Sequence, residues 1–218
     1  MSAPPTSEAE LLARAHGLAG RSVGHLARRL GRPLPLDPVH GKGLAGELAE
    51  LALGATAGNT DQPDFPGLGI ELKTIPLDEE GHVRESTYVC AIDLGQVQQE
   101  EWERSRVRRK LARVLWLPVE WAPGKPPALR HYGTPLLWSP DEDEERALRG
   151  DWLELIGRVA VGGIEEVTAH MGQVLQIRPK AASASVLVEV AGPEGEPLLT
   201  VPRGFYLRAS FTEKLLWR

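Results

Sequence analysis

The sequence predicts an α/β protein in which helices flank a mixed β-sheet. Apolar residues recur at helical spacing in four segments, residues 7–15, 22–30, 44–53 and 139–159. Short apolar or β-branched runs typical of strands occupy residues 70–75, 86–92, 114–119, 174–178, 198–201 and 205–207. At 218 residues the chain is long enough for one large domain or two lobes.

The ends of the predicted helices carry capping residues. Ser7 and Glu10 have the spacing of a capping box, and Ser22 precedes the second helix. Ser139 is the expected cap of the last helix, because a proline and a run of acids follow it, as is typical of a first helical turn. Glu47 and Glu50 lie on a polar face of the helix expected at residues 44–53.

The stretch from Pro63 to Ile75 has the most informative pattern. Because strand side chains alternate, Glu71 and Lys73 point to the same face of the predicted strand, ~7 Å apart. Gly67 and Gly69 permit a sharp turn that would return the Asp64 carboxylate to the side of Glu71. Two acids and one lysine would then share a site.

These residue types suit metal-assisted hydrolysis of a phosphodiester. Mg²⁺ prefers oxygen ligands, usually one or two carboxylates with waters and substrate phosphate, and a lysine adds positive charge beside the same oxygens. Either Glu47 or Glu50 is placed to contribute a further acid. The alternative is a surface salt bridge between Glu71 and Lys73 and a solvated acidic helix face, which would have no chemical role.

Composition excludes several other classes of protein. The single cysteine, Cys90, cannot form an internal disulfide and lies in an apolar run typical of a core, and the six histidines lack zinc-ligand spacing. Lys42 lies between glycines, but the phosphate-loop pattern of nucleotide hydrolases is absent. The first residues do not resemble a signal peptide and no apolar run is long enough to span a bilayer, so we expect a cytoplasmic protein.

Net charge is −5, yet positive charge is concentrated locally. Residues 104–113 hold six cations, and on a helix Arg106, Arg109, Lys110 and Arg113 would share one face, either solvated or contacting phosphates. A stretch rich in proline at residues 118–127 is the expected hinge. It would separate two lobes of a single domain, about residues 1–125 and about residues 126–218.

The motif Pro63-Asp64 followed by Glu71-Leu72-Lys73 resembles the active-site signature of the restriction-endonuclease-like nucleases. Over nearly the whole chain, the order and spacing of several stretches resemble the MutH-type endonucleases of methyl-directed mismatch repair. These stretches are residues 50–58, 64–76, 107–116, 135–140, 175–182 and 202–207.

The resemblance implies a restriction-endonuclease-like fold with two arms around a DNA-binding cleft. It implies that Asp64, Glu71 and Glu50 are Mg²⁺ ligands, that Lys73 is the catalytic lysine, and that Lys110 is a second cation near the scissile phosphate. The family nicks the unmethylated strand at hemimethylated GATC, and the mismatch-repair ATPase MutL, recruited by the mismatch sensor MutS, activates it. The chain would act on double-stranded DNA, as a monomer.

Sequence-specific contacts are also implied by the resemblance. Arg178 matches the family's base-reading arginine, which can bond O6 and N7 of guanine in the major groove. Tyr206 matches the aromatic residue that senses adenine methylation, and Tyr88 stands where better-known members carry phenylalanine. Lys180 and Lys42 are expected to contact bases or phosphates. The alternative for both tyrosines is a core aromatic with a polar tip.

Two other functions fit the same residues. A restriction enzyme of related fold would cut both strands of GATC, because a symmetric dimer offers one active site to each strand. A DNA-binding module without catalytic activity would use the basic residues and merely retain the acids.

Overall fold

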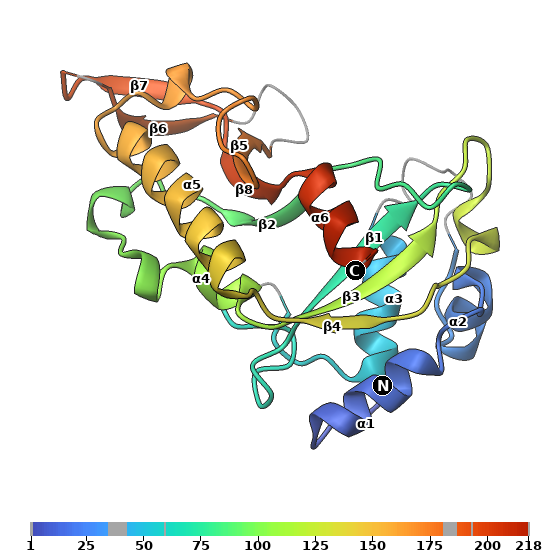
Figure 1. Ribbon diagram of the computed structural model, residues 1–218. Helices are drawn as coiled ribbons and strands as arrows, with labels where there is room; N and C mark the ends of the chain where they lie inside the picture. Colours follow the sequence, from blue (N-terminus) through green and yellow to red (C-terminus); the bar gives the residue numbers. More distant parts are fainter. Residues whose placement is uncertain (1, 35–42, 59, 181–186, 193, 218) are drawn as a thin grey trace. The chain divides into compact units, whose positions relative to one another are not determined.

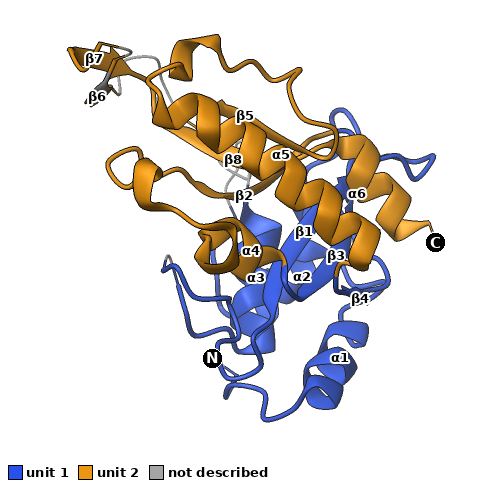
Figure 2. Ribbon diagram, turned by 60° about the vertical axis from the view of Figure 1, so that its left-hand side comes forward, with its two compact units in different colours: residues 1–84, 112–139 blue, residues 85–111, 140–218 orange. Residues whose placement is uncertain are grey.

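A computed structural model describes residues 2–34, 43–58, 60–180, 187–192 and 194–217 (Figure 1). The chain is of mixed α/β class, with open sheets flanked by helices, as predicted. It divides into two compact units (Figure 2). Unit 1 comprises residues 1–84 and 112–139, and unit 2 comprises residues 85–111 and 140–218.

Unit 1 is built on a three-stranded mixed sheet. Its strands are β1 (Glu71–Leu77), β3 (Val114–Glu120) and β4 (Leu136–Trp138), and β3 lies in the middle. Strand β1 pairs with β3 in parallel, with Glu71 opposite Val114, whereas β4 runs antiparallel to β3. The mixed sheet predicted for the stretches at residues 70–75 and 114–119 is therefore confirmed, and β1 extends two residues further.

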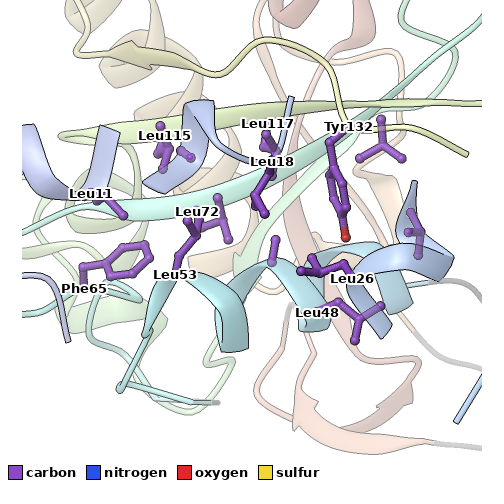
Figure 3. Packing of buried hydrophobic residues seen from close by; sticks show 14 of the residues in the cluster. Leu11, Leu18, Leu26, Leu48, Leu53, Phe65, Leu72, Leu115, Leu117 and Tyr132 are labelled. Atoms are coloured by element: carbon purple, nitrogen blue, oxygen red, sulfur yellow. The ribbon is translucent and has the colours of Figure 1, made fainter. Parts of the chain in front are cut away.

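Three helices belong to unit 1, namely α1 (Glu8–His16), α2 (Val23–Arg29) and α3 (Leu44–Leu53). Ser7 and Ser22 cap α1 and α2 as predicted, since their side chains accept bonds from backbone N–H groups of the first turn. Helix α3 contacts β1, and Leu53 of α3, Leu72 of β1 and Leu115 of β3 belong to one buried cluster (Figure 3). This apolar packing fixes the helix that carries Glu50 against the strand that carries Glu71.

Unit 2 contains an antiparallel sheet of β2 (Thr87–Ala91), β8 (Arg203–Leu207) and β5 (Leu175–Pro179), with β8 in the middle. A hairpin of β6 (Val188–Ala191) and β7 (Pro197–Thr200) is separate. The helices are α4 (Arg106–Leu111), α5 (Glu142–Ala160) and α6 (Ala209–Leu216). Short 3-10 turns lie at Val97–Gln99, Trp102–Arg104 and Ile164–Glu166 in unit 2, and at Pro127–Leu129 in unit 1.

The expected placement of residues 86–92 in the same mixed sheet is wrong, because β2 pairs with β8 and not with β1 or β3. The boundary between the two units also differs from the expected hinge at residues 118–127, because all of residues 112–139 belong to unit 1. Pairing explains both differences: β4 completes the sheet of β3, and β2 is held by a strand more than a hundred residues later.

The cap of α5 is Asp141 and not the expected Ser139. The Asp141 side chain accepts hydrogen bonds from the backbone N–H groups of Asp143 and Glu144. The Glu144 carboxylate in turn accepts a hydrogen bond from the Asp141 N–H at 2.9 Å. This reciprocal capping box satisfies more donors than a serine cap would. Ser139 instead accepts a bond from Arg113 at 3.1 Å. Among the helices of the described residues, none is long and apolar enough to cross a membrane.

Candidate active site

Asp64 is fixed against β1 by a tight turn. The N–H and C=O of Phe65 both bond to Ile70, at 2.9 and 3.3 Å, and Gly69 adopts φ 66°, which favours glycine. This turn returns the chain so that Oδ2 of Asp64 accepts the backbone N–H of Leu72 at 2.8 Å. The carboxylate, on a residue with 8% exposure, therefore lies beside the backbone that carries Glu71 and Lys73.

Glu71 and Lys73 form a direct ion pair. Lys73 Nζ lies 2.7 Å from Oε1 of Glu71, and the two side chains are 11% and 4% exposed, respectively. A pair on a solvated surface would be far more exposed, so the surface salt bridge considered from the sequence does not describe this arrangement. The pair holds the ammonium group beside the acidic residues of the site.

Glu50 of α3 lies in the electrostatic field of both acids. Burial, followed by the charges of Asp64, Glu47 and Glu71, raises the pKa of Glu50 to about 7, and Lys73 alone among the named charges opposes this shift. We call Glu50, Asp64, Glu71 and Lys73 the acidic cluster. Of the two glutamates considered on this helix, Glu47 is exposed, whereas Glu50 is partly buried with the cluster.

The acidic cluster fits a divalent cation by its chemistry. Negative charges crowded in a partly buried site raise the free energy of ionisation, and a bound cation would relieve that cost. Among the residues that the structure describes, no three His, Cys, Asp or Glu side chains form a ready-made metal site, so the assignment of Asp64, Glu71 and Glu50 as metal ligands stays a prediction. Mg²⁺ commonly takes one or two carboxylates together with waters and phosphate oxygens, and the cluster can supply the carboxylates.

Unit 2 gathers the residues expected to read DNA. Tyr88 of β2 pairs with Tyr206 of β8, and the rings meet edge to face with centroids 5.3 Å apart. Arg178 of β5 lies 5.9 Å from the Tyr206 ring centroid, and Lys180 Nζ lies 4.2 Å from that of Tyr88. We call Tyr88, Tyr206, Arg178 and Lys180 the recognition face.

The hydroxyl of Tyr88 also accepts a bond from Lys180 Nζ. Burial raises the pKa of this phenol to about 12 and, together with the neighbouring Tyr88, raises that of Tyr206. Both phenols therefore stay neutral at physiological pH. Because Tyr88 and Tyr206 are only partly buried and each lies beside a cation, neither is a core aromatic of the kind considered as an alternative.

Gly204 leaves the space in which the Tyr88 ring packs. A Cβ atom at this position would lie 2.9 Å from the Cys90 carbonyl oxygen and 2.9 Å from the ring of Tyr88. The expectation that Cys90 is a small core residue is confirmed, because it is buried with 4% exposure.

We predict that Gly204→Ala lowers the free energy of unfolding by about 1–3 kcal/mol, because the added methyl group overpacks backbone and ring. Gly157→Ala is the matched control: Gly157 lies in α5 with open space around its Cβ position, so alanine should stabilise by up to ~1 kcal/mol. Urea unfolding of both variants measures the difference. Equal stability of the two variants would contradict the packing described for Gly204.

Helix α4 is shorter than the sequence suggests, and its faces differ from the prediction. Lys110 is buried with 7% exposure, beside Val107 and Leu111, whereas Arg113 lies beyond the end of the helix. Arg113 pairs with Glu8 at 2.7 Å and Arg108 pairs with Glu145 at 2.9 Å. The four-residue cationic face expected from helical spacing is therefore not formed, because Lys110 is buried and Arg113 lies beyond the helix, where it pairs with an acid.

The predicted site residues fall into two groups. The acidic cluster lies in unit 1, and the recognition face and Lys110 lie in unit 2. Burial raises the pKa of Tyr88, and the positive charge of Lys110 opposes this effect but is smaller. Lys42 lies outside the described residues.

Sequence reasoning missed Ser86 and Gln176, which bond to each other, and Ser86 also bonds to Arg178 of the recognition face. Gln176 Nε2 donates to Ser86 Oγ at 2.6 Å, and Arg178 Nη1 donates to the same oxygen at 3.2 Å. Period-two alternation is the signal that could have found them, since each lies two residues from a predicted reader, namely Tyr88 or Arg178.

Comparisons with known proteins point to one family. The family model described as DNA mismatch repair enzyme MutH matches residues 53–151. The DNA mismatch repair protein MutH of Klebsiella pneumoniae (strain 342) is 52% identical over 218 residues, which cover 100% of this chain and 94% of the relative. The protein of the same name from Salmonella paratyphi B is 51% identical over 215 residues, covering 99% of this chain and 93% of the relative. The chain therefore belongs to the MutH family of DNA mismatch repair enzymes.

Proposed function

We propose that the chain is a Mg²⁺-dependent endonuclease that nicks the unmethylated strand of DNA at hemimethylated GATC sites during mismatch repair. The observation that carries this proposal is the acidic cluster, in which Asp64 and Glu71 are fixed on one turn and strand and Glu50 faces their charge. Membership of the MutH family supports an action on DNA in mismatch repair.

In the proposed reaction, Asp64 and Glu71, with Glu50, would hold Mg²⁺. When bound, this ion would lower the pKa of a water molecule and neutralise charge that develops on the phosphate. The positively charged ammonium group of Lys73 can swing from the Glu71 carboxylate to a phosphate oxygen of the substrate. The raised pKa of Glu50 suits a carboxylate that ionises fully only when a cation lies beside it.

Sequence specificity is assigned to the recognition face. Arg178 can donate two bonds to O6 and N7 of a guanine, a pattern that distinguishes guanine from the other bases in the major groove. The N6 amino group of adenine and its methyl group project into the same groove, so an aromatic ring packed there can distinguish them. We assign that role to Tyr206, which its contact with Tyr88 holds in place. Lys180, and Lys42 outside the described residues, are proposed to contact bases or phosphates, and Lys110 is proposed to act near the scissile phosphate.

The proposed partners are double-stranded DNA and the ATPase MutL, with MutS acting through MutL. A single active site on a bound palindrome would cut one strand, which fits a monomeric nuclease working with the chromosome in the cytoplasm.

A plasmid assay tests the proposed function. Hemimethylated, unmethylated and fully methylated plasmids are incubated with the protein and Mg²⁺, with and without MutL, and nicked and linear products are separated. We expect nicks in the unmethylated strand, stimulation by MutL and far slower cutting of fully methylated DNA. Rapid linearisation that ignores methylation would instead support a restriction enzyme, and binding without any cutting would support a non-catalytic module.

We predict that Tyr206→Ser weakens discrimination against methylated DNA more than it weakens binding. Serine removes the ring that would distinguish the adenine amino group from its methylated form but leaves the cations of the recognition face. The ratio of nicking rates on hemimethylated and fully methylated plasmid, with DNA affinity measured in parallel, should fall by about tenfold, the size of a lost base-edge contact. An unchanged ratio of nicking rates would contradict the assignment of Tyr206 as the residue that senses adenine methylation.

A further inference from the structure

Ser86 joins two side chains of strand β5 through one hydroxyl group. Its Oγ accepts Nε2 of Gln176 at 2.6 Å and Nη1 of Arg178 at 3.2 Å. A serine hydroxyl offers two acceptor lone pairs, so these two donors use both. Ser86 immediately precedes β2, two sheet positions away from β5, and it therefore ties the two outer strands of this sheet together.

Strand register places these groups on the face that carries the tyrosines. Gln176 is opposite Tyr206, and Tyr206 is opposite Tyr88, so the three side chains form a row across the sheet. Arg178 follows Gln176 by two residues and shares its face. Residue 204, opposite Arg178, is a glycine, so no side chain from β8 intervenes there.

The two donors differ in mobility. Gln176 is buried with 4% exposure, so its amide gives the Ser86 hydroxyl a fixed position. Arg178 is exposed, and a long exposed arginine samples many rotamers unless a contact restrains it. Among the described residues, Ser86 and the Tyr206 ring both contact the guanidinium and restrain it. The remaining N–H groups of the guanidinium can then serve a base, since arginine has five.

We propose that Ser86 is a positioning residue for guanine recognition, holding the guanidinium of Arg178 in the orientation that reads the base, with Gln176 fixing Ser86 in turn. This inference rests on the proposed function, because it assigns Ser86 to the base-reading step of that reaction. Ser86 acts through Arg178 and does not itself contact the substrate.

Single-turnover nicking of hemimethylated DNA tests the inference. Ser86→Ala removes the acceptor, and Ser86→Thr keeps a hydroxyl at the same position. Each is measured on a GATC site and on a site in which 7-deazaguanine replaces the guanine, which removes the N7 acceptor and with it the bidentate contact. The same measurements are made in an Arg178→Ala background, and Ser210→Ala, a change at an exposed serine of α6, is the control.

We expect Ser86→Ala to lower kcat/KM on GATC by about tenfold, the effect of losing one hydrogen bond to a charged group. The loss should shrink to less than twofold on 7-deazaguanine DNA and in the Arg178→Ala background, and Ser86→Thr should restore most of it. A merely structural role would lower the rate equally on both substrates.

Three results would overturn the inference. If the wild-type protein nicks GATC and Ser86→Ala matches it, or if the loss is the same with and without Arg178, Ser86 has no positioning role and the proposed function stands. If the wild-type protein does not nick GATC at all, the proposed function fails and this inference fails with it.

Discussion

Replacing Lys73 by alanine should lower the rate of DNA nicking by about 10²–10³-fold while leaving DNA affinity nearly unchanged. The ammonium group lies 2.7 Å from Glu71 within the acidic cluster, where its charge can stabilise a phosphate oxygen as negative charge accumulates. Binding affinity for DNA depends on many phosphate contacts, so removing one buried lysine changes it little. Single-turnover nicking and an equilibrium binding assay separate the two effects.

Lys125→Ala is the matched control for this variant. Lys125 also pairs with a glutamate of unit 1, Glu120, but the Glu120 side chain is 49% exposed and the pair lies outside the acidic cluster. We expect its nicking rate to equal that of the wild-type protein. Glu71→Ala should lose nicking as severely as Lys73→Ala. A wild-type nicking rate in either Lys73→Ala or Glu71→Ala would contradict a role of the acidic cluster in the reaction.

The second large effect is expected for Glu50→Gln, which should abolish most nicking and yet stabilise the fold at high pH. Burial and the charges of Asp64 and Glu71 raise the pKa of Glu50 from 4.5 to about 7 in the folded protein. A carboxyl group whose folded pKa is raised contributes stability below its unfolded pKa, and that contribution is lost as pH rises through the folded value. Glutamine is neutral throughout and avoids the loss.

Thermal unfolding in EDTA between pH 5 and pH 8.5 measures this effect. The Tm of Glu50→Gln should exceed that of the wild-type protein by about 2–4 °C above pH 7, and the difference should shrink toward pH 5. Glu47→Gln, on the exposed side of the same helix, removes one of the charges that raise the pKa of Glu50, so it should raise Tm above pH 7 by less than Glu50→Gln does. A Tm for Glu50→Gln below wild type at pH 8.5 would contradict the electrostatic account of the cluster.

The strand and the helix that carry the acidic cluster were predictable because their signals are local. Alternation placed Glu71 and Lys73 on one face, the glycines implied the turn that returns Asp64, and leucine spacing gave the bounds of the helix at residues 44–53. Each depends on residues within one turn or one strand of each other. Periodicity alone left Glu47 and Glu50 as alternatives, and the choice of Glu50 came from the family resemblance.

Long-range pairing accounts for most of what the sequence did not show. Strand β2 meets β8, and no local pattern distinguishes that partner from β1 or β3. The basic residues at 104–113 were predicted as a cationic face, but distant acids, Glu8 and Glu145, pair with two of them. Similarly, Ser86 became informative only when its distance to Gln176 and Arg178 was known.

The Mg²⁺ dependence of nicking tests the central claim most directly. Hemimethylated plasmid is incubated with wild-type protein and with Glu71→Gln over a range of Mg²⁺ concentrations and in EDTA. We predict that wild-type nicking is absent in EDTA and rises to saturation with Mg²⁺, and that Glu71→Gln remains inactive or requires much more of the ion. Nicking that persists in EDTA, or the same Mg²⁺ dependence in both proteins, would contradict the assignment of the acidic cluster as a metal-dependent nuclease site.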